Sequence, residues 1–282
     1  MLFDGTNSRL ISGKQERERR EIASLTKIMT CYLAIDLAER MKLDLNTFSV
    51  TVSKIACSMF GTTARLREGD VLKLIDLLHA LMLPSGNDAA VAIAEGLGKV
   101  LKLENEKKLA QAGAKENTED RPLKSSFAYF IEAMNQKAAE LELIDTHYSN
   151  PHGLSHSNNL SSAYDVARLC ITAMKNEIFR KIVRKKEYTC TVFQGNRLRR
   201  EMTWENTNKL LGHGYEGVKT GITPTAGPCL ASSLRRSKDR HLICVLLNAS
   251  DLDTRFSESR RLMEYGERKM FHKAFDDINP YK

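Results

Sequence analysis

Ser24 and Lys27 are the residues of this sequence whose types and spacing most directly suggest chemistry. They lie three positions apart at the start of a segment, residues 25–41, whose apolar side chains recur at helical spacing. Residues three apart share one helical face, so the Ser24 hydroxyl and the Lys27 amine can meet above the first turn. A buried amine with a lowered pKa can take the proton of that hydroxyl, and the N–H groups at a helix start favour developing negative charge. The pair predicts a serine nucleophile with its own base.

The same spacing is also typical of an ordinary amphipathic helix with a solvated lysine, so the rest of the chain must decide. A polar break between two apolar helices carries Ser85-Gly86-Asn87, and a predicted strand carries Lys219-Thr220-Gly221. A second Ser-x-Asn, Ser157–Asn159, lies in a polar loop, where a solvated turn is the better interpretation. In this order the three motifs form the set S-x-x-K, S-x-N and K-T-G, which serves serine acyl transfer in penicillin-binding proteins and class A β-lactamases.

The first two motifs are predicted to supply the catalytic residues. Lys27, directly or through Ser85, is expected to move the proton that Ser24 loses and the leaving amine gains. Asn87 is expected to hold Lys27 in place and to hydrogen-bond an amide of the substrate.

The third motif and the residues after it are predicted to bind substrate. Lys219 and Thr220, with the strand that bears them, can bind a carboxylate and pair with an extended peptide. The backbone N–H groups of Ser24 and Ile222 would hold the oxyanion. The complete predicted substrate-binding set is Lys219, Thr220, Gly221, Ile222 and Thr223.

Composition excludes several classes of function. The net charge is +8, from 43 basic and 35 acidic residues, but the basic residues are mixed with acids and form no basic–aromatic stripe, which argues against nucleic-acid binding. The six cysteines form no C-x-x-C pair and no metal-type spacing, so neither a metal nor another cofactor is predicted. No apolar run reaches the roughly 18 residues that span a membrane, and the N-terminus does not resemble a signal peptide.

The hydrophobic pattern predicts helices enclosed by short strands. Strands are expected in a hairpin over 1–14 and over 48–52, 188–193, 217–221, 229–234 and 241–247. Helices are expected over 25–41, from Asp70 as N-cap through Met82, and over 89–97, 126–143, 161–175 and 253–270. Residues 102–124 are polar and charged and are predicted to form a surface insertion. Because strands stand at both ends, we predict one α/β unit whose N- and C-terminal strands share a sheet.

The segments around the motifs resemble the serine D-Ala-D-Ala carboxypeptidases, the low-molecular-weight penicillin-binding proteins of peptidase family S11. The resemblance runs from about Leu2 to Gly266 and is carried by residues 23–30, 82–90, 134–138, 146–154 and 217–221. It implies a β-lactamase/transpeptidase-like fold of the α+β kind, with an antiparallel sheet, flanking helices and a helical lobe, as a single domain over 1–282 with the active site between the lobes. It also implies removal of the terminal D-alanine of peptidoglycan stem peptides ending in D-Ala-D-Ala, through an acyl-enzyme on Ser24, with β-lactams as covalent inhibitors and a cell-envelope location.

The sequence departs from the usual family pattern in ways that leave the catalytic residues untouched. An export signal, a C-terminal β-rich domain and a membrane anchor are not recognised here, and the insertion is longer than usual. A β-lactamase remains an alternative, but the loop over 146–160 contains no acid comparable to the class A glutamate. An esterase or amidase on the same scaffold and a truncated, non-catalytic relative remain open as well. In the same loop, His147 or His152 either orients the hydrolytic water or stabilises a turn.

Overall fold

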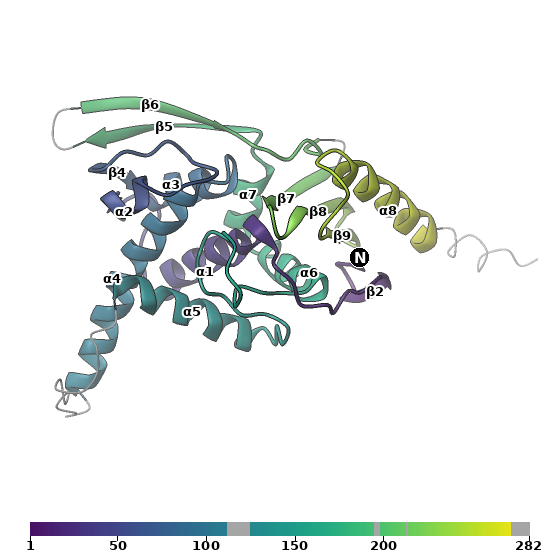
Figure 1. Ribbon diagram of the computed structural model, residues 1–282, viewed down its shortest axis with the longest axis horizontal. Helices are drawn as coiled ribbons and strands as arrows, with labels where there is room; N and C mark the ends of the chain where they lie inside the picture. Colours follow the sequence, from purple (N-terminus) through teal and green to yellow (C-terminus); the bar gives the residue numbers. More distant parts are fainter. Residues whose placement is uncertain (112–124, 195–197, 213, 272–282) are drawn as a thin grey trace, which may run out of the picture.

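Two antiparallel sheets and eight α-helices make up the part of the chain described by the computed structural model, residues 1–111, 125–194, 198–212 and 214–271 (Figure 1). The five-stranded sheet has the order β2-β1-β9-β8-β7, and the four-stranded sheet has the order β3-β4-β5-β6. The strands are β1 (Leu2–Asp4), β2 (Arg9–Ser12), β3 (Ser49–Thr51), β4 (Asp70–Lys73), β5 (Glu187–Gln194), β6 (Leu198–Glu205), β7 (Tyr215–Thr223), β8 (Gly227–Ser237) and β9 (Arg240–Leu246). The helices are α1 (Thr26–Arg40), α2 (Lys54–Cys57), α3 (Leu74–Met82), α4 (Asn87–Gln111), α5 (Ser126–Glu140), α6 (Ala163–Ala173), α7 (Glu177–Arg184) and α8 (Thr254–Phe271).

The larger sheet joins the two ends of the described chain, as the sequence predicted. β1 pairs antiparallel with both β2 and β9, so the N-terminal hairpin completes a sheet that residues 215–246 begin. α8 packs against β8, β9 and β1, and α6 packs against β9 and β8. β7 lies at the opposite edge of the sheet, and among the described residues one side of this strand has no strand partner.

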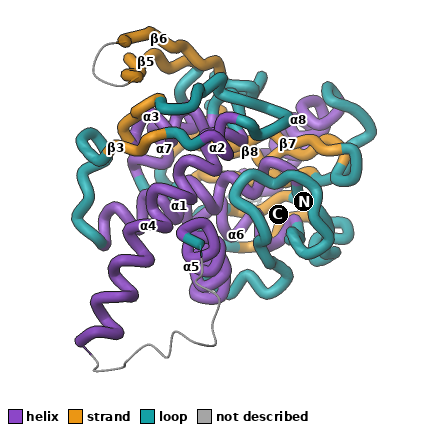
Figure 2. Tube along the Cα trace, turned by 60° about the vertical axis from the view of Figure 1, so that its left-hand side comes forward, coloured by secondary structure: helices purple, strands orange, loops and turns teal. Residues whose placement is uncertain are grey.

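α1 is the central helix of the molecule. It contacts α3, α4, α5, α6 and α7 as well as β7 (Figure 2). The sequence predicted a helix with one apolar face here, but the helix is buried on nearly all sides, including Thr26, Lys27 and Thr30. A helix enclosed in this way needs small or apolar side chains all round, which explains why its apolar stripe is so broad. The polar residues it does bury must therefore find partners in the elements around it.

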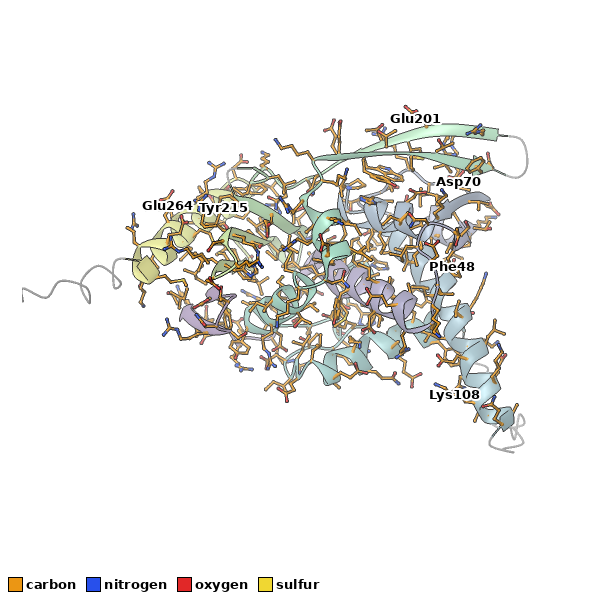
Figure 3. All side chains as sticks on the ribbon, turned by 180° about the vertical axis from the view of Figure 1, so that it is seen from behind. Phe48, Asp70, Lys108, Glu201, Tyr215 and Glu264 are labelled. Carbon is orange, nitrogen blue, oxygen red and sulfur yellow. The ribbon has the colours of Figure 1, made fainter. Side chains whose placement is uncertain are left out.

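The smaller sheet contains the one clear error of the sequence-based assignment. Asp70 does not cap a helix: it lies in β4, and α3 begins four residues later at Leu74. Its buried carboxylate accepts hydrogen bonds from the Arg67 backbone and from the Arg200 guanidinium of β6, at 2.7 Å to Nη1. No turn separates β4 from α3, and the strands that pair with β4 come from elsewhere in the chain, so local pattern could not reveal it. Figure 3 labels Asp70 beside the β5–β6 hairpin that carries Glu201.

Four further elements differ from the prediction. α2, α7 and β6 were not predicted as regular elements, and α4 runs on to Gln111 instead of ending near residue 97. The extension of α4 includes the first ten residues of the predicted insertion, and residues 112–124 lie outside the described part of the chain. Ion pairs at helical spacing, Lys102–Glu106 and Glu104–Lys108, support this polar end of α4 (Figure 3 labels Lys108).

We predict that the insertion is dispensable for folding. Replacing residues 104–121 with a short Gly/Ser linker should lower the melting temperature by no more than about 3 °C, because this segment is rich in charged residues and contains few large apolar ones. Differential scanning calorimetry measures the change. A loss of the cooperative transition would show that this segment packs on the core.

Candidate active site

Ser24 lies in a short 3-10 helix, η1 (Ala23–Leu25), immediately before α1. The sequence predicted Ser24 at the start of the long helix, directly before its first apolar residue, and the α-helix itself begins at Thr26. Ala23 adopts a left-handed conformation with φ of 47°, and this tight entry turns Ser24 toward Lys27 on the first turn of α1. The Lys27 Nζ lies 2.9 Å from the Ser24 Oγ, as the spacing predicted.

The Lys27 amine is fully buried and has three oxygen neighbours. Besides Ser24, it lies 2.7 Å from the Asn87 Oδ1 and 2.6 Å from the His152 carbonyl oxygen. Burial, and then the nearby Lys219 cation, hold the pKa of Lys27 well below its usual value, against an opposing effect of Asp88. A neutral amine has two N–H groups and one lone pair. The two carbonyl oxygens can only accept, so they take both N–H groups and direct the lone pair at the Ser24 hydroxyl.

The Pro-Ser-Gly-Asn break brings Asn87 to the Lys27 amine and carries Ser85 two residues before it. Ser85 has a left-handed φ of 66°, and its buried Oγ has no hydrogen-bond partner among the described residues. The Asn87 side chain bridges two elements, because its Oδ1 faces Lys27 while its Nδ2 donates to the Phe60 carbonyl at 2.7 Å. Ser85 thus offers an uncommitted hydroxyl, whereas Asn87 is held at both ends.

Asp88 anchors the wall that faces this break, a role that the sequence analysis missed. Its buried carboxylate accepts hydrogen bonds from the backbone N–H groups of Ala64 and Leu66 and from the Thr63 hydroxyl. The Thr62 hydroxyl also donates to the Ser85 carbonyl at 2.7 Å. Residues 60–66 therefore form a wall held by the same loop that carries Ser85 and Asn87. An acid directly after Ser-x-Asn, at a helix start, was the available signal.

β7 brings the third motif against Ser24. Gly221 lies so close to η1 that a Cβ added to it would meet the Ser24 backbone nitrogen at 3.0 Å and the Ala23 Cβ at 3.1 Å. A side chain here would force η1 to shift by a few tenths of an ångström, so glycine favours this close approach of the strand. Figure 1 shows the start of α1 beside β7, in agreement with the contacts that β7 makes with η1.

The register of β7 leaves the backbone of Ile222 available. Ile222 pairs with Pro228 of β8, and the Pro228 carbonyl accepts a hydrogen bond from the Ala249 N–H at 2.9 Å, on the side away from β7. In an antiparallel pair the N–H and C=O of one residue point to the same side, so Ile222 and Pro228 form a non-hydrogen-bonded pair. The N–H and C=O of Ile222 therefore point out of the free edge, beside Ser24.

Lys219 is the second buried lysine at the site. Its side chain is 1% exposed, and its Nζ donates to the Thr220 carbonyl at 3.0 Å. Burial, followed by the charge of Arg255, lowers the pKa of Lys219 to about 7. Arg255, from α8, donates to the carbonyl oxygens of Gly221 and Cys229 and so ties β7 to β8. The sequence analysis did not select Arg255, because nothing local marks a helix arginine that reaches a distant strand.

The two threonine hydroxyls that were predicted to bind substrate have hydrogen-bond partners within the protein. The Thr220 Oγ1 lies 2.7 Å from the Thr207 Oγ1, a contact that no motif of the sequence predicts. The Thr223 Oγ1 accepts from the Ala226 N–H and lies 3.4 Å from the Thr225 Oγ1. Thr220 thus stands in the site beside Lys219, whereas Thr223 shapes the β7–β8 turn.

The loop over 146–160 supports the site mainly through its backbone. Gly153, at φ of 86°, leaves no room for a side chain against the Ala23 carbonyl. The His152 Nδ1 accepts a hydrogen bond from the Leu154 N–H, so its proton lies on the other ring nitrogen. Burial, and then Lys27, lower the pKa of His152 to about 3. The exposed His147 bonds to the Asn158 carbonyl. These contacts fit the turn-stabilising interpretation of both histidines.

The described residues offer neither a metal site nor a membrane-spanning helix. No set of three or more His, Cys, Asp or Glu side chains in residues 1–111, 125–194, 198–212 and 214–271 is placed to hold a metal ion. All six cysteines are free thiols, and none of the helices in this part of the chain combines the length and apolar character needed to cross a membrane.

Comparison with known proteins identifies the relatives of this chain. The family model of peptidase S11, described as D-alanyl-D-alanine carboxypeptidase, matches residues 1–101 and 124–251. The D-alanyl-D-alanine carboxypeptidase of Streptomyces sp. (strain K15) is 33% identical over 269 residues, which cover 94% of this chain and 84% of the relative. DacF of Bacillus subtilis (strain 168) is 29% identical and DacD of Escherichia coli (strain K12) 30% identical, and this chain spans 60% and 62% of their lengths.

The solved structures agree on the fold. The crystal structure of the Streptomyces K15 DD-transpeptidase superposes with a TM-score of 0.79 at 30% identity and covers 94% of each chain. The predicted family resemblance and the β-lactamase/transpeptidase-like fold class are thereby confirmed. The family model omits residues 102–123, which supports the proposal that this segment is an addition to the common fold.

We predict that the buried charge at Lys219 costs stability at low pH. The pKa is about 7 in the folded protein against 10.5 ordinarily, so below pH 7 both states are protonated and the folded state bears the full cost of the charge. Between these values only the unfolded state stays charged, and stability rises with pH. Lys219→Met should therefore raise the free energy of unfolding at pH 6 by on the order of 3 kcal/mol, and by much less near pH 10.

Urea denaturation followed by circular dichroism measures the difference between the two proteins at each pH. Lys209→Met is the matched control, because the Lys209 side chain is 70% exposed. A stabilisation that is the same at both pH values would show that Lys219 keeps its charge in the folded protein.

Proposed function

The chain belongs to the peptidase S11 family of D-alanyl-D-alanine carboxypeptidases, and we propose that it removes the terminal D-alanine of peptidoglycan stem peptides through an acyl-enzyme on Ser24. The observation that carries this proposal is the environment of the Lys27 amine. Two acceptor-only carbonyl oxygens, at 2.7 and 2.6 Å, direct its lone pair at the Ser24 hydroxyl. A serine with a neutral amine in this position can attack an amide carbonyl without any other base.

Acylation then follows from the positions of these groups. The Ser24 Oγ attacks the carbonyl carbon of the penultimate D-alanine while its proton passes to Lys27. The negative charge on the carbonyl oxygen is stabilised by the N–H groups of Ser24 and Ile222. As the C–N bond breaks, the leaving amine takes a proton from Lys27 through the uncommitted hydroxyl of Ser85. Terminal D-alanine leaves as the free amino acid, and water later hydrolyses the ester and restores the Ser24 hydroxyl.

The orientation of the substrate follows from the groups that line the free edge of β7. The terminal carboxylate is expected to bind the Lys219 ammonium and the Thr220 hydroxyl, which stand together before Gly221. The peptide then runs along the free edge, with the carbonyl of Ile222 accepting the N–H of the penultimate residue. The remainder of the stem peptide continues past Thr223 toward the β7–β8 turn. We call this direction the acyl-donor side of the site.

The hydrolysis of the ester distinguishes a peptidase from a β-lactamase. The loop over 146–160 carries no carboxylate, and the acceptor nitrogen of His152 is already bonded to Leu154. Neither a carboxylate nor His152 of this loop therefore activates water to attack a bulky penicilloyl ester. We accordingly favour a carboxypeptidase that β-lactams inhibit covalently over a β-lactamase, with the cell envelope, where peptidoglycan lies, as its site of action.

We predict that benzylpenicillin forms a single adduct on Ser24 that persists for minutes or longer. Intact-protein mass spectrometry over time measures it, and Ser24→Ala should show no adduct while its circular dichroism spectrum stays unchanged. A D-Ala-D-Ala peptide should release D-alanine repeatedly with the same preparation. Rapid turnover of penicillin without a lasting adduct would instead identify a β-lactamase.

We also predict different roles for the two buried lysines. Lys27→Ala should lower kcat/KM for the peptide by about 10²- to 10⁴-fold, because the proton path is lost. Lys219→Ala should lower it mainly by raising KM, because carboxylate recognition is lost. Near-normal turnover by both variants would contradict these assignments.

The pH dependence provides a further check on Lys219. Because its pKa in the free enzyme is about 7, kcat/KM for a peptide with a free terminal carboxylate should fall above pH 7. The same peptide with a terminal carboxamide should be a poor substrate without this fall. An equal fall for both peptides would assign the titration to another group.

A further inference from the structure

Phe60 is a large apolar side chain that stands exposed beside the candidate active site. It is 71% exposed, and it follows α2 on the wall formed by residues 60–66. Its carbonyl oxygen accepts the Asn87 Nδ2 at 2.7 Å, and Asn87 in turn contacts Lys27, the neighbour of Ser24. Three hydrogen bonds in series thus connect Phe60 to the nucleophile. A single exposed apolar side chain is ordinary on a protein surface, so what distinguishes Phe60 is this series of hydrogen bonds, which fixes its backbone beside the nucleophile.

The contacts of the neighbouring Gly61 place the segment that carries Phe60 on the acyl-donor side. Thr225 follows Thr223 at the β7–β8 turn, and the Thr225 Oγ1 lies 2.6 Å from the Ser155 Oγ of the loop over 146–160. Leu154, the residue before Ser155, is close to Gly61: a Cβ on Gly61 would meet the Leu154 Cδ2 at 3.6 Å. The β7–β8 turn therefore contacts the loop over 146–160, and this loop lies close to the segment that carries Phe60. All three lie on the side toward which the stem peptide continues.

We propose that Phe60 forms the apolar contact of an acyl-donor subsite, which takes the aliphatic or aromatic part of the group attached to the penultimate residue. The partly exposed Leu154 adds apolar surface on one side, and Ile222, 48% exposed, does so on the edge of β7. This inference rests on the proposed function, because it uses the direction of the bound peptide. It adds a preference among substrates: a donor with a long apolar side chain before D-Ala-D-Ala is acylated faster than one with glycine there.

The test compares two penicillins that differ at the acyl-donor position. Benzylpenicillin carries a phenylacetyl amide there, whereas 6-aminopenicillanic acid has a free amine. Phe60→Ala should lower the second-order acylation rate constant for benzylpenicillin by about 10-fold, a free energy of about 1.4 kcal/mol, and that for 6-aminopenicillanic acid by less than about 2-fold. The substitution keeps the backbone carbonyl that holds Asn87.

Three controls make the result specific. Phe60→Leu should retain most of the selectivity, because it keeps apolar area at the position. Ile144→Ala removes an exposed isoleucine, 76% exposed and outside the site described above, and should change neither rate constant. Peptides ending in Gly-D-Ala-D-Ala and norleucyl-D-Ala-D-Ala repeat the comparison with peptide substrates. The wild-type preference for the norleucyl peptide should shrink in Phe60→Ala.

The possible failures can be told apart. Equal losses for both penicillins would overturn the proposal and assign Phe60 a purely structural role, and so would the absence of any loss. If the wild-type protein is acylated by neither penicillin and releases no D-alanine from either peptide, the proposed function itself fails.

Discussion

The burial of the Lys27 amine is the constraint on which the rest of the structure depends. A lysine deep in a protein is costly when charged, and the cost falls when the amine is neutral and all its hydrogen-bonding positions are filled. Here those positions are filled by one serine hydroxyl and two carbonyl oxygens, which come from η1, the start of α4 and the loop over 146–160. Three segments far apart in the sequence must therefore meet at one nitrogen atom.

Much of the surrounding architecture serves to hold these three segments together around Lys27. α1 is enclosed by five helices, which removes Lys27 from water, and Asp88 fixes the loop that carries Ser85 and Asn87. Gly221 lets β7 approach the Ser24 backbone, and Gly153 lets the loop pack on Ala23. The left-handed conformations of Ala23 and Ser85 cost free energy, and such strain persists only where the surroundings impose it.

Two buried lysines in one site also imply a compromise between stability and activity. A buried cation lowers the pKa of the cation beside it, as the effects of Lys219 on Lys27 and of Arg255 on Lys219 illustrate. The site gains a base whose pKa lies well below that of an ordinary lysine and a carboxylate-binding group that can still be charged near neutral pH. Sites of this kind are held together by the remainder of the fold rather than by their own contacts.

The sequence by itself determined the chemistry and the family. Ser24, Lys27, Ser85, Asn87 and Lys219 stand in motifs whose residue types and order are informative without coordinates, and the helical and strand periods placed most elements correctly. Glycine, proline and asparagine at residues 84–88 also marked the break that presents Ser85 and Asn87, because such residues interrupt helices for local steric reasons.

Only the tertiary structure decided which groups surround those motifs. Asp70 was misassigned because its partner, Arg200, lies on a strand 130 residues away, and no local pattern records that contact. Arg255, Thr207, Phe60 and the His152 carbonyl were missed for the same reason, since each reaches the site across a long separation in sequence. The pKa of Lys27 is a property of complete burial by distant segments. Residue type and spacing can identify a candidate base, but the lowered pKa that a base needs comes from the packing around it.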